Sequence, residues 1–219
     1  MTHLYLIRHA QPEGCGPGIV GSRRPNSGLS QLGRVQAEHL RNRLATTKEI
    51  HADVLISSPL LRAKETADIL APALGQAVLI DDGVQEFSYG EGEGLTVEEF
   101  VERFGPDTTD QEPFRRITPT GDSLAGFTIR ACEALDRLTR HYDGKTIVIV
   151  CHGGIIHASF IYFLGLSPLK PFPIFLNHHD TAITHWYRAS SFPGKQEALW
   201  CLERYDDYSH LPAHLKGDL

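Results

Sequence analysis

The stretch TIVIVCHGG, residues 146–154, decides how the rest of this chain is interpreted. Its first five residues are apolar or β-branched, and they predict a buried strand over 146–150. His152 and two glycines follow, and the apolar segment after them predicts a helix to about Leu164. A strand that passes through a short polar turn into a helix is the repeating unit of an α/β protein.

Two earlier segments repeat this order of strand, polar turn and helix. Residues 3–7 (HLYLI) predict a strand, and Ser30 is expected to be the N-cap of the helix that follows. Residues 53–57 (DVLIS) predict a second strand, and Ser58 and Pro59 are expected to open the next helix as N-cap and first helical residue. The chain thus contains at least three units of one kind.

The remaining elements are weaker signals of the same type. The helix after Ser58 is expected to end near Leu70, because Pro72 and Gly75 follow. The other expected elements are, in chain order, a strand over 78–80, a short helix opened by a Thr96–Glu99 capping box, a long helix opened by Ser123, and strands over 182–188 and 199–205. Strands that alternate with helices predict a three-layer α/β/α sandwich around a mostly parallel sheet.

Length and charge limit the organisation and the partners of the chain. The 219 residues suit one domain over 1–219, in which 87–120 forms an irregular lid or substrate-loop region and 206–219 a loose C-terminal tail. The formal net charge of −6 offers no basic excess for nucleic acid. The N-terminus lacks the apolar core of a signal peptide, and no segment is long enough to span a membrane, so we expect a cytoplasmic protein. A homodimer is the base-rate expectation for its assembly.

Charged and titratable side chains follow three of the expected strands. Arg8 and His9 follow the first strand, Arg62 lies in the first turn after the second, and His152 follows the strand over 146–150. Taken one at a time, such residues are usually solvated or hydrogen-bonded structural groups. The carboxyl ends of parallel strands meet at one edge of the sheet, and several potential cations gathered there are costly without an anion. Arginine presents a fork of donors that matches phosphate oxygens, so the set predicts a phosphate pocket.

These residues carry a resemblance to a known family. The segments 6–11 (LIRHAQ), 57–67 (SSPLLRAKETA) and 150–154 (VCHGG), together with Glu86, resemble the histidine phosphatase superfamily, also called phosphoglycerate mutase-like. The likeness extends from residue 3 to about residue 188 and implies the same three-layer fold.

The resemblance also implies a mechanism. His9 would attack phosphorus and form a phosphohistidine, while Arg8, Arg62 and His152 would bind the phosphoryl oxygens. The backbone N–H of Gly153 would add a donor. The family's proton donor to the leaving group would be Glu86, with Glu91 and Glu93 as alternatives in the same acidic stretch. The substrate would be a small phosphorylated metabolite, and no metal or cofactor is implied.

The chain departs from the family pattern at three places. Ala10 stands where a glycine is usual, and Cys15 lies in a loop segment that often carries an asparagine. The span between Glu86 and His152 is shorter than in true mutases, which shield an intermediate from water, so we expect a phosphatase. A mutase-type phosphoryl transferase remains an alternative, as does a catalytically idle phosphate-binding regulator.

Two arginine pairs lie in the expected loops and are candidates for substrate contact. Arg23 and Arg24 precede the first helix, and Arg115 and Arg116 lie near the end of the lid region. These arginines are either solvated surface pairs or contacts to the substrate, and such contacts would imply a second acidic group on the substrate. Two other features carry no function in this interpretation, namely Cys151 as a nucleophile and the stretch 178–180 (His-His-Asp) as a metal site.

Overall fold

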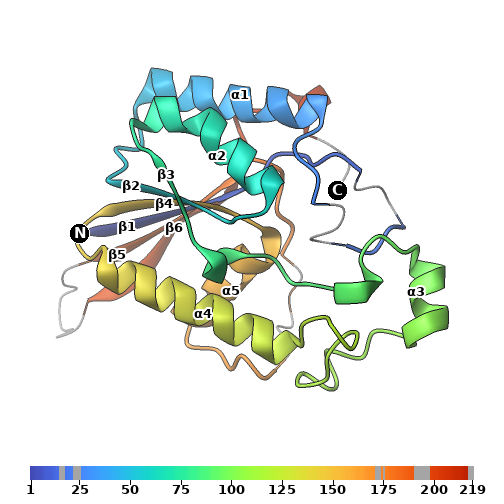
Figure 1. Ribbon diagram of the computed structural model, residues 1–219. Helices are drawn as coiled ribbons and strands as arrows, with labels where there is room; N and C mark the ends of the chain where they lie inside the picture. The colour runs from blue at the N-terminus through green and yellow to red at the C-terminus, as the bar shows by residue number, and fades with distance from the viewer. Residues whose placement is uncertain (15–17, 22–25, 171–173, 175, 190–197, 217–219) are drawn as a thin grey trace.

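A six-stranded sheet with the order β3-β2-β4-β1-β5-β6 forms the centre of the protein (Figure 1). The computed structural model describes residues 1–14, 18–21, 26–170, 174, 176–189 and 198–216. The strands are β1 (Thr2–Arg8), β2 (Val54–Ser57), β3 (Val78–Ile80), β4 (Thr146–Cys151), β5 (Ile183–Ala189) and β6 (Leu199–Asp207). The pairings among β1 to β4 are parallel, whereas β5 and β6 are antiparallel to their neighbours. The prediction of a mostly parallel sheet is confirmed.

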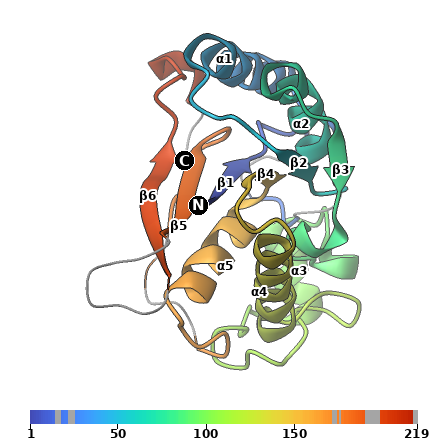
Figure 2. The ribbon, with the colours of Figure 1, turned by 90° about the vertical axis from the view of Figure 1, so that its left-hand side faces the viewer.

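Helices cover both faces of this sheet, as predicted (Figure 2). The helices are α1 (Gln31–Thr47), α2 (Leu61–Leu74), α3 (Val97–Phe104), α4 (Leu124–His141) and α5 (Gly153–Phe163). The pair α1 and α2 lies on one face, and the pair α4 and α5 lies on the other. The short α3 stands apart from the sandwich, at the end of an irregular excursion (Figure 1). None of the helices in the described ranges is long and apolar enough to cross a bilayer.

The alternation of side chains along β1 shows how the two layers are held. Leu4 and Leu6 are fully buried in the cluster under α4 and α5. Tyr5 and Ile7 point the other way, into the cluster under α1 and α2. Successive side chains on a strand face opposite sides, so a strand that is apolar throughout needs a helical layer on each side.

The helix starts largely follow the expected capping residues. The side chains of Ser30 and Ser123 each accept a bond from the amide three residues on, and Thr96 and Glu99 complete the capping box. The prediction for the second helix is wrong. The helix α2 begins at Leu61, and its N-cap Leu60 makes no side-chain capping bond.

The end of α2 also differs from the prediction. The helix continues past Leu70 to Leu74, with Pro72 inside it, and Gly75 ends it at φ 65°. A proline at this position shortens the helix little, because only two residues lie between it and the glycine cap.

The C-terminal segment is packed where the sequence suggested a loose tail from residue 206. The strand β6 continues to Asp207, and Leu211 and Leu215 beyond it are buried. Gln36 of α1 donates from Nε2 to the carbonyl of Leu215 at 2.8 Å. Side-chain burial and this bond fasten residues 208–216 to α1.

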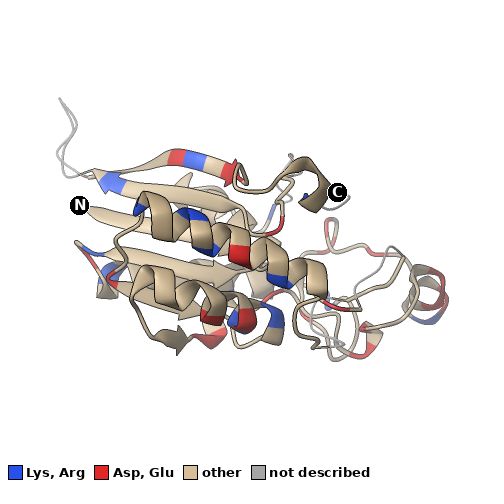
Figure 3. Ribbon diagram, turned by 90° about the horizontal axis from the view of Figure 1, so that it is seen from above, with Lys and Arg blue, Asp and Glu red and all other residues tan. Residues whose placement is uncertain are grey.

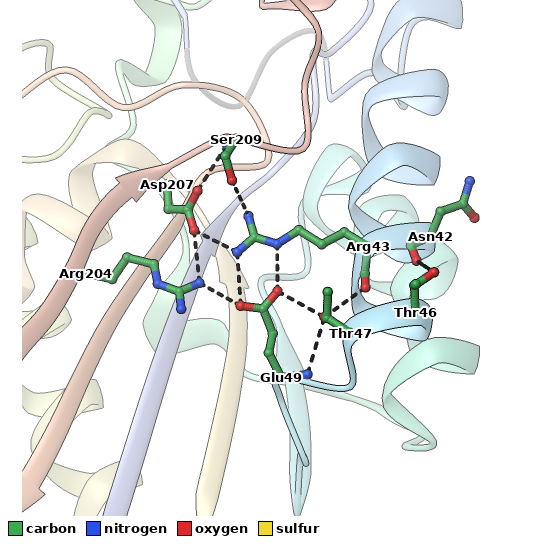
Figure 4. A network of polar contacts seen from close by, with 8 residues as sticks. All are labelled: Asn42, Arg43, Thr46, Thr47, Glu49, Arg204, Asp207 and Ser209. Carbon is green, nitrogen blue, oxygen red and sulfur yellow. Dashed lines mark hydrogen bonds and ion pairs between the residues drawn. The ribbon is translucent and has the colours of Figure 1, made fainter.

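A network of charged side chains joins α1 to β6 (Figure 4). The guanidinium of Arg43 donates to Glu49 at 2.6 and 3.0 Å and to Asp207 at 2.8 Å. Arg204 bonds the same two carboxylates at 2.8 and 2.9 Å. These bonds hold the pKa of Glu49 down at about 2, chiefly through Arg43. The network fixes the edge strand β6 against the rest of the sandwich.

Candidate active site

The residues that follow β1, β2 and β4 meet at one edge of the sheet. In the sheet register Arg8 lies beside Cys151, and Ser57 lies beside Val150. The residues that come next in each chain segment, His9, Ser58 and His152, therefore leave the sheet at the same level. The structure brings together the strand ends that the sequence predicted would meet.

His9 is held by two hydrogen bonds that fix its tautomer. Its Nδ1 lies 2.7 Å from the carbonyl oxygen of Ala10, which can only accept, so Nδ1 carries the proton. The Nε of Arg62, which can only donate, lies 3.1 Å from Nε2 of His9. With the proton on Nδ1, the neutral ring has its one lone pair on Nε2, and that lone pair accepts the bond from Arg62.

The surroundings of His9 also keep its imidazole neutral. The ring is buried, with 6% of its surface exposed, and burial lowers its pKa well below the ordinary 6.5. The positive charges of Arg62 and Arg8 lower the pKa further. A neutral imidazole with its lone pair on Nε2 is a competent nucleophile near pH 7 once Arg62 gives up its bond to that atom.

His152 lies beside His9 and is oriented by a serine. The two ring centroids are 5.0 Å apart, and His152 has no exposed surface. Its Nε2 lies 2.8 Å from the hydroxyl of Ser58. We predicted Ser58 as a helix cap, but its side chain instead contacts an active-site histidine. The signal available in the sequence was a serine that directly follows a predicted buried strand.

Arg8 is positioned from the side of β5. Its Nη1 donates to the carbonyl of His178 and lies 3.5 Å from Asp180. Burial raises the pKa of Asp180, while Arg8 and a hydrogen bond from Gln36 oppose that rise. Gln36 also accepts from the backbone N–H of Gln11 at 2.9 Å. Asp180 and Gln36 are supporting residues that the sequence analysis missed, because only the tertiary fold places them near Arg8.

Glu86 is fastened to the turn that carries His152. Its Oε2 accepts from the backbone N–H of Gly154 at 3.0 Å, and its Oε1 accepts from the N–H of Phe87 at 2.9 Å. The position of Gly154 leaves no room for a side chain, since a Cβ there would lie 2.7 Å from Cζ of Phe127 and closer still to Glu86. The glycine therefore allows the carboxyl group to approach the start of α5.

Two cavities flank this turn, and Gly154 and His157 line both. The first, called here the Arg8 cavity, measures about 480 Å³ and is lined by Arg8 and the loop before β5. The second, called the Glu86 cavity, measures about 500 Å³ and is lined by Glu86, aromatic residues and the lid region. Glu91 and Glu93 line neither cavity.

The loop arginines differ from the strand-end residues in their surroundings. Arg115 bonds Glu112 and Thr108 at 3.0 Å, and Arg116 donates to the carbonyl of Gly121 at 2.8 Å. Neither lines the two cavities. Each of these bonds joins the arginine to a residue between positions 108 and 121. Arg23 and Arg24 lie outside the described residues.

The remaining candidates have structural roles in the described residues. Cys151 is fully buried, which raises the pKa of its thiol and disfavours a thiolate. His179 bonds Asp206 at 2.6 Å. No group of three or more His, Cys, Asp or Glu in the described ranges is arranged to hold a metal ion.

A known protein family matches most of the chain. The sequence model of the histidine phosphatase superfamily (branch 1) matches residues 4–192. The chain belongs to the histidine phosphatase superfamily. Within that range lie the sheet up to β5, all five helices and each of the strand-end residues described above.

Individual members of the superfamily match much of the chain. A putative phosphoserine phosphatase 2 of Hydrogenobacter thermophilus is 33% identical over 170 residues, which are 76% of this chain and 81% of that protein. An uncharacterized phosphatase of Bacillus subtilis, PhoE, is 33% identical over 99% of this chain and 100% of its own. A crystal structure of a mutant phosphoserine phosphatase from Entamoeba histolytica, in complex with phosphoserine, has 26% identity and a TM-score of 0.73 over 97% of this chain and 100% of that one.

Proposed function

We propose that this histidine phosphatase family member is a metal-independent phosphomonoester hydrolase that acts through a phosphohistidine at His9. The single observation that carries the proposal is the pair of hydrogen bonds that place the proton on Nδ1 and the lone pair on Nε2 of a buried, neutral His9. The substrate is a small phosphorylated metabolite, as the names of the phosphoserine phosphatases among its relatives suggest.

In the first step Nε2 of His9 attacks phosphorus. The new P–N bond forms as the bond between phosphorus and the leaving oxygen breaks. Arg8, Arg62 and His152 bind the three phosphoryl oxygens, and the backbone N–H of Gly153 at the start of α5 adds a donor. The arginine charges and the other donors are in place before the reaction and stabilise the charge that spreads over those oxygens in the transition state.

Glu86 completes both halves of the reaction. As a protonated carboxyl group it gives its proton to the leaving alkoxide, and the alcohol departs. The resulting carboxylate then takes a proton from a water molecule that attacks the phosphohistidine, so that the P–N bond breaks and inorganic phosphate is released. General acid and base catalysis of this kind contributes ~10²–10⁴-fold.

The test is phosphate release from a chromogenic phosphomonoester between pH 5 and 8 in the presence of EDTA. We expect the wild-type protein to release phosphate and to carry an acid-labile phosphoryl group, whereas His9→Ala does neither. His51→Ala is the matched control, because His51 is exposed before β2, away from the site. Turnover that survives in His9→Ala, or that EDTA abolishes, would refute the mechanism.

The same assay separates the two alternatives raised by the sequence. A mutase conserves phosphate and is stimulated by a bisphosphate, and a phosphate-binding regulator binds phosphate without labelling at His9. Either result in place of phosphate release would overturn the proposed hydrolase.

A further inference from the structure

The two cavities beside the site differ in charge. Arg8 and Lys216 line the Arg8 cavity, where Asp180 is the carboxylate. Three carboxyl groups line the Glu86 cavity, those of Glu86, Asp107 and Asp110, and Lys170 is the cation in its lining. The formal charge is thus +2 − 1 = +1 in the first cavity and +1 − 2 = −1 in the second, with the histidines taken as neutral and Glu86 as the protonated acid that the proposed mechanism requires.

The Glu86 cavity is the place for the leaving group, on the proposed mechanism. A group that protonates the leaving oxygen must lie next to it, and Glu86 lines this cavity and not the other. The phosphoryl group is drawn to the opposite side of Gly154, where Arg8 and the N-terminus of α5 lie.

The inner wall of the Glu86 cavity is apolar and aromatic. Phe127 meets Phe87 edge to face with the ring centroids 5.7 Å apart, and Tyr89 packs on Phe87 at 5.2 Å. Leu124 and Ile161 extend the same wall. A leaving group with hydrocarbon surface loses contact with water here, whereas a carboxylate finds no partner on this wall.

The lid region adds acidic side chains to the lining of the same cavity, namely Asp107 and Asp110. Asp107 is held in place because its Oδ1 accepts from the amide and the hydroxyl of Thr109 at 2.8 and 2.7 Å. The charge of Asp107 acts on Tyr89, which also lines the cavity. The pKa of Tyr89 is raised, mainly by burial and next by Asp107, with Glu86 contributing as well. In Figure 3 acidic positions recur in the loops around α3, at the right of the view.

We propose that the Glu86 cavity selects leaving alcohols that lack a carboxylate, and takes uncharged or ammonium-bearing alcohols instead, with Asp107 and Asp110 as the specificity-determining residues. The proposal rests on the proposed function, because it assigns the leaving group to the side of Glu86. On this proposal, the substrate of this protein differs from that of phosphatases whose substrate carries a free carboxylate as well as the phosphate.

The selection against a carboxylate is tested with two substrates of the same carbon skeleton and with a third whose leaving group is cationic. Glycerol 3-phosphate and 3-phosphoglycerate differ only in an alcohol group against a carboxylate, and ethanolamine phosphate adds a cationic leaving group. We expect kcat/KM for glycerol 3-phosphate and ethanolamine phosphate to exceed that for 3-phosphoglycerate by at least about tenfold at low ionic strength, given two exposed charges within ~10 Å. The ratio should shrink as salt is raised to ~1 M, because screening acts on charge and not on shape.

Removal of the two lid carboxylates tests their role. In Asp107→Asn/Asp110→Asn the preference for glycerol 3-phosphate over 3-phosphoglycerate should fall about tenfold, to near unity. Glu112→Gln is the matched control, since it removes one charge from the same segment at a side chain that does not line the cavity, and its ratio should equal that of the wild type.

The outcomes are distinct from a failure of the proposed function. If no ester releases phosphate in a His9-dependent way, the hydrolase itself is refuted. If phosphate is released, but 3-phosphoglycerate is hydrolysed as well as glycerol 3-phosphate or the preference does not respond to salt and to the double substitution, the hydrolase stands and the selection is refuted.

Discussion

The substitution Gly154→Ala should damage catalysis without damaging the fold. The methyl group would lie 2.7 Å from Cζ of Phe127 and overlap the carboxyl group of Glu86. An ordinary contact between such atoms is ~3.5 Å, so the carboxyl group has to move by about 1 Å. Alanine is also the better helix former, and Gly154 is the second residue of α5. The strain is therefore taken up by Glu86, whose bond to the amide of Gly154 is broken or bent.

The expected loss follows from that displacement. A catalytic group that is misplaced by ~1 Å costs roughly 10²-fold in rate, within the ~10²–10⁴-fold that a general acid contributes. We expect kcat for an alkyl phosphate to fall about 100-fold. With 4-nitrophenyl phosphate, whose leaving group needs no proton, the first step should be spared. A burst of one equivalent of nitrophenolate should then precede slow turnover.

The neighbouring glycine supplies the control. A methyl group at Gly153 would meet only Cδ2 of His178, at 3.3 Å, and the backbone N–H that faces the substrate is kept. Gly153→Ala should therefore lose no more than about threefold in kcat, since a contact of 3.3 Å is relieved by a small shift. Thermal unfolding should show both variants folded at 25 °C.

Two results would refute this reasoning. Wild-type kcat in a folded Gly154→Ala would mean that the observed position of Glu86 is not needed for proton transfer. An equal loss in Gly153→Ala would mean that the whole turn is distorted, and that the overlap with Glu86 is not the cause.

Three further expectations concern orientation and stability. Ser58→Ala should lower kcat about tenfold, and Ser58→Thr should restore most of it, because the hydroxyl orients His152 through a hydrogen bond worth ~1–1.5 kcal/mol. Glu49→Gln should lower the urea-derived free energy of unfolding by ~2 kcal/mol, because it weakens a partly buried network, whereas Asp68→Asn in an exposed pair should cost under ~0.5 kcal/mol. Burial lowers the pKa of three histidines to about 4, so the unfolded state binds more protons between pH 6.5 and 4, and the free energy of unfolding should fall by roughly 3 kcal/mol from pH 7 to pH 5. These histidines are His178, His185 and His210. A kcat unchanged in Ser58→Ala, equal costs for the two carboxylate variants, or a flat stability between pH 7 and 5 would contradict the respective expectation.

The strand-and-helix order of this protein was readable from the sequence because the signals are local. A run of apolar residues such as 146–150 has to be covered on both faces, and a side chain such as that of Ser123 caps a helix three residues away. The rule that parallel strands end at one edge then places Arg8, His9 and His152 together, as the register shows.

Local signals were misleading where a side chain has a distant partner. Ser58 is followed by proline and looked like a helix cap, but its hydroxyl faces a histidine 94 residues away. The same holds for the C-terminal segment, where the composition is polar but Leu211 and Leu215 are buried against the sandwich.

The residue types at the site were thus determined by the sequence, whereas their protonation states and the residues that position them were decided by the tertiary structure. No local pattern states that His9 is buried between two arginines, which is what lowers its pKa. No spacing in the sequence links Gln36 and Asp180 to Arg8, or brings Asp107 to the cavity that Phe87 and Phe127 line. Hydrogen bonds, desolvation and charge act through space, and only the packed chain sets those distances.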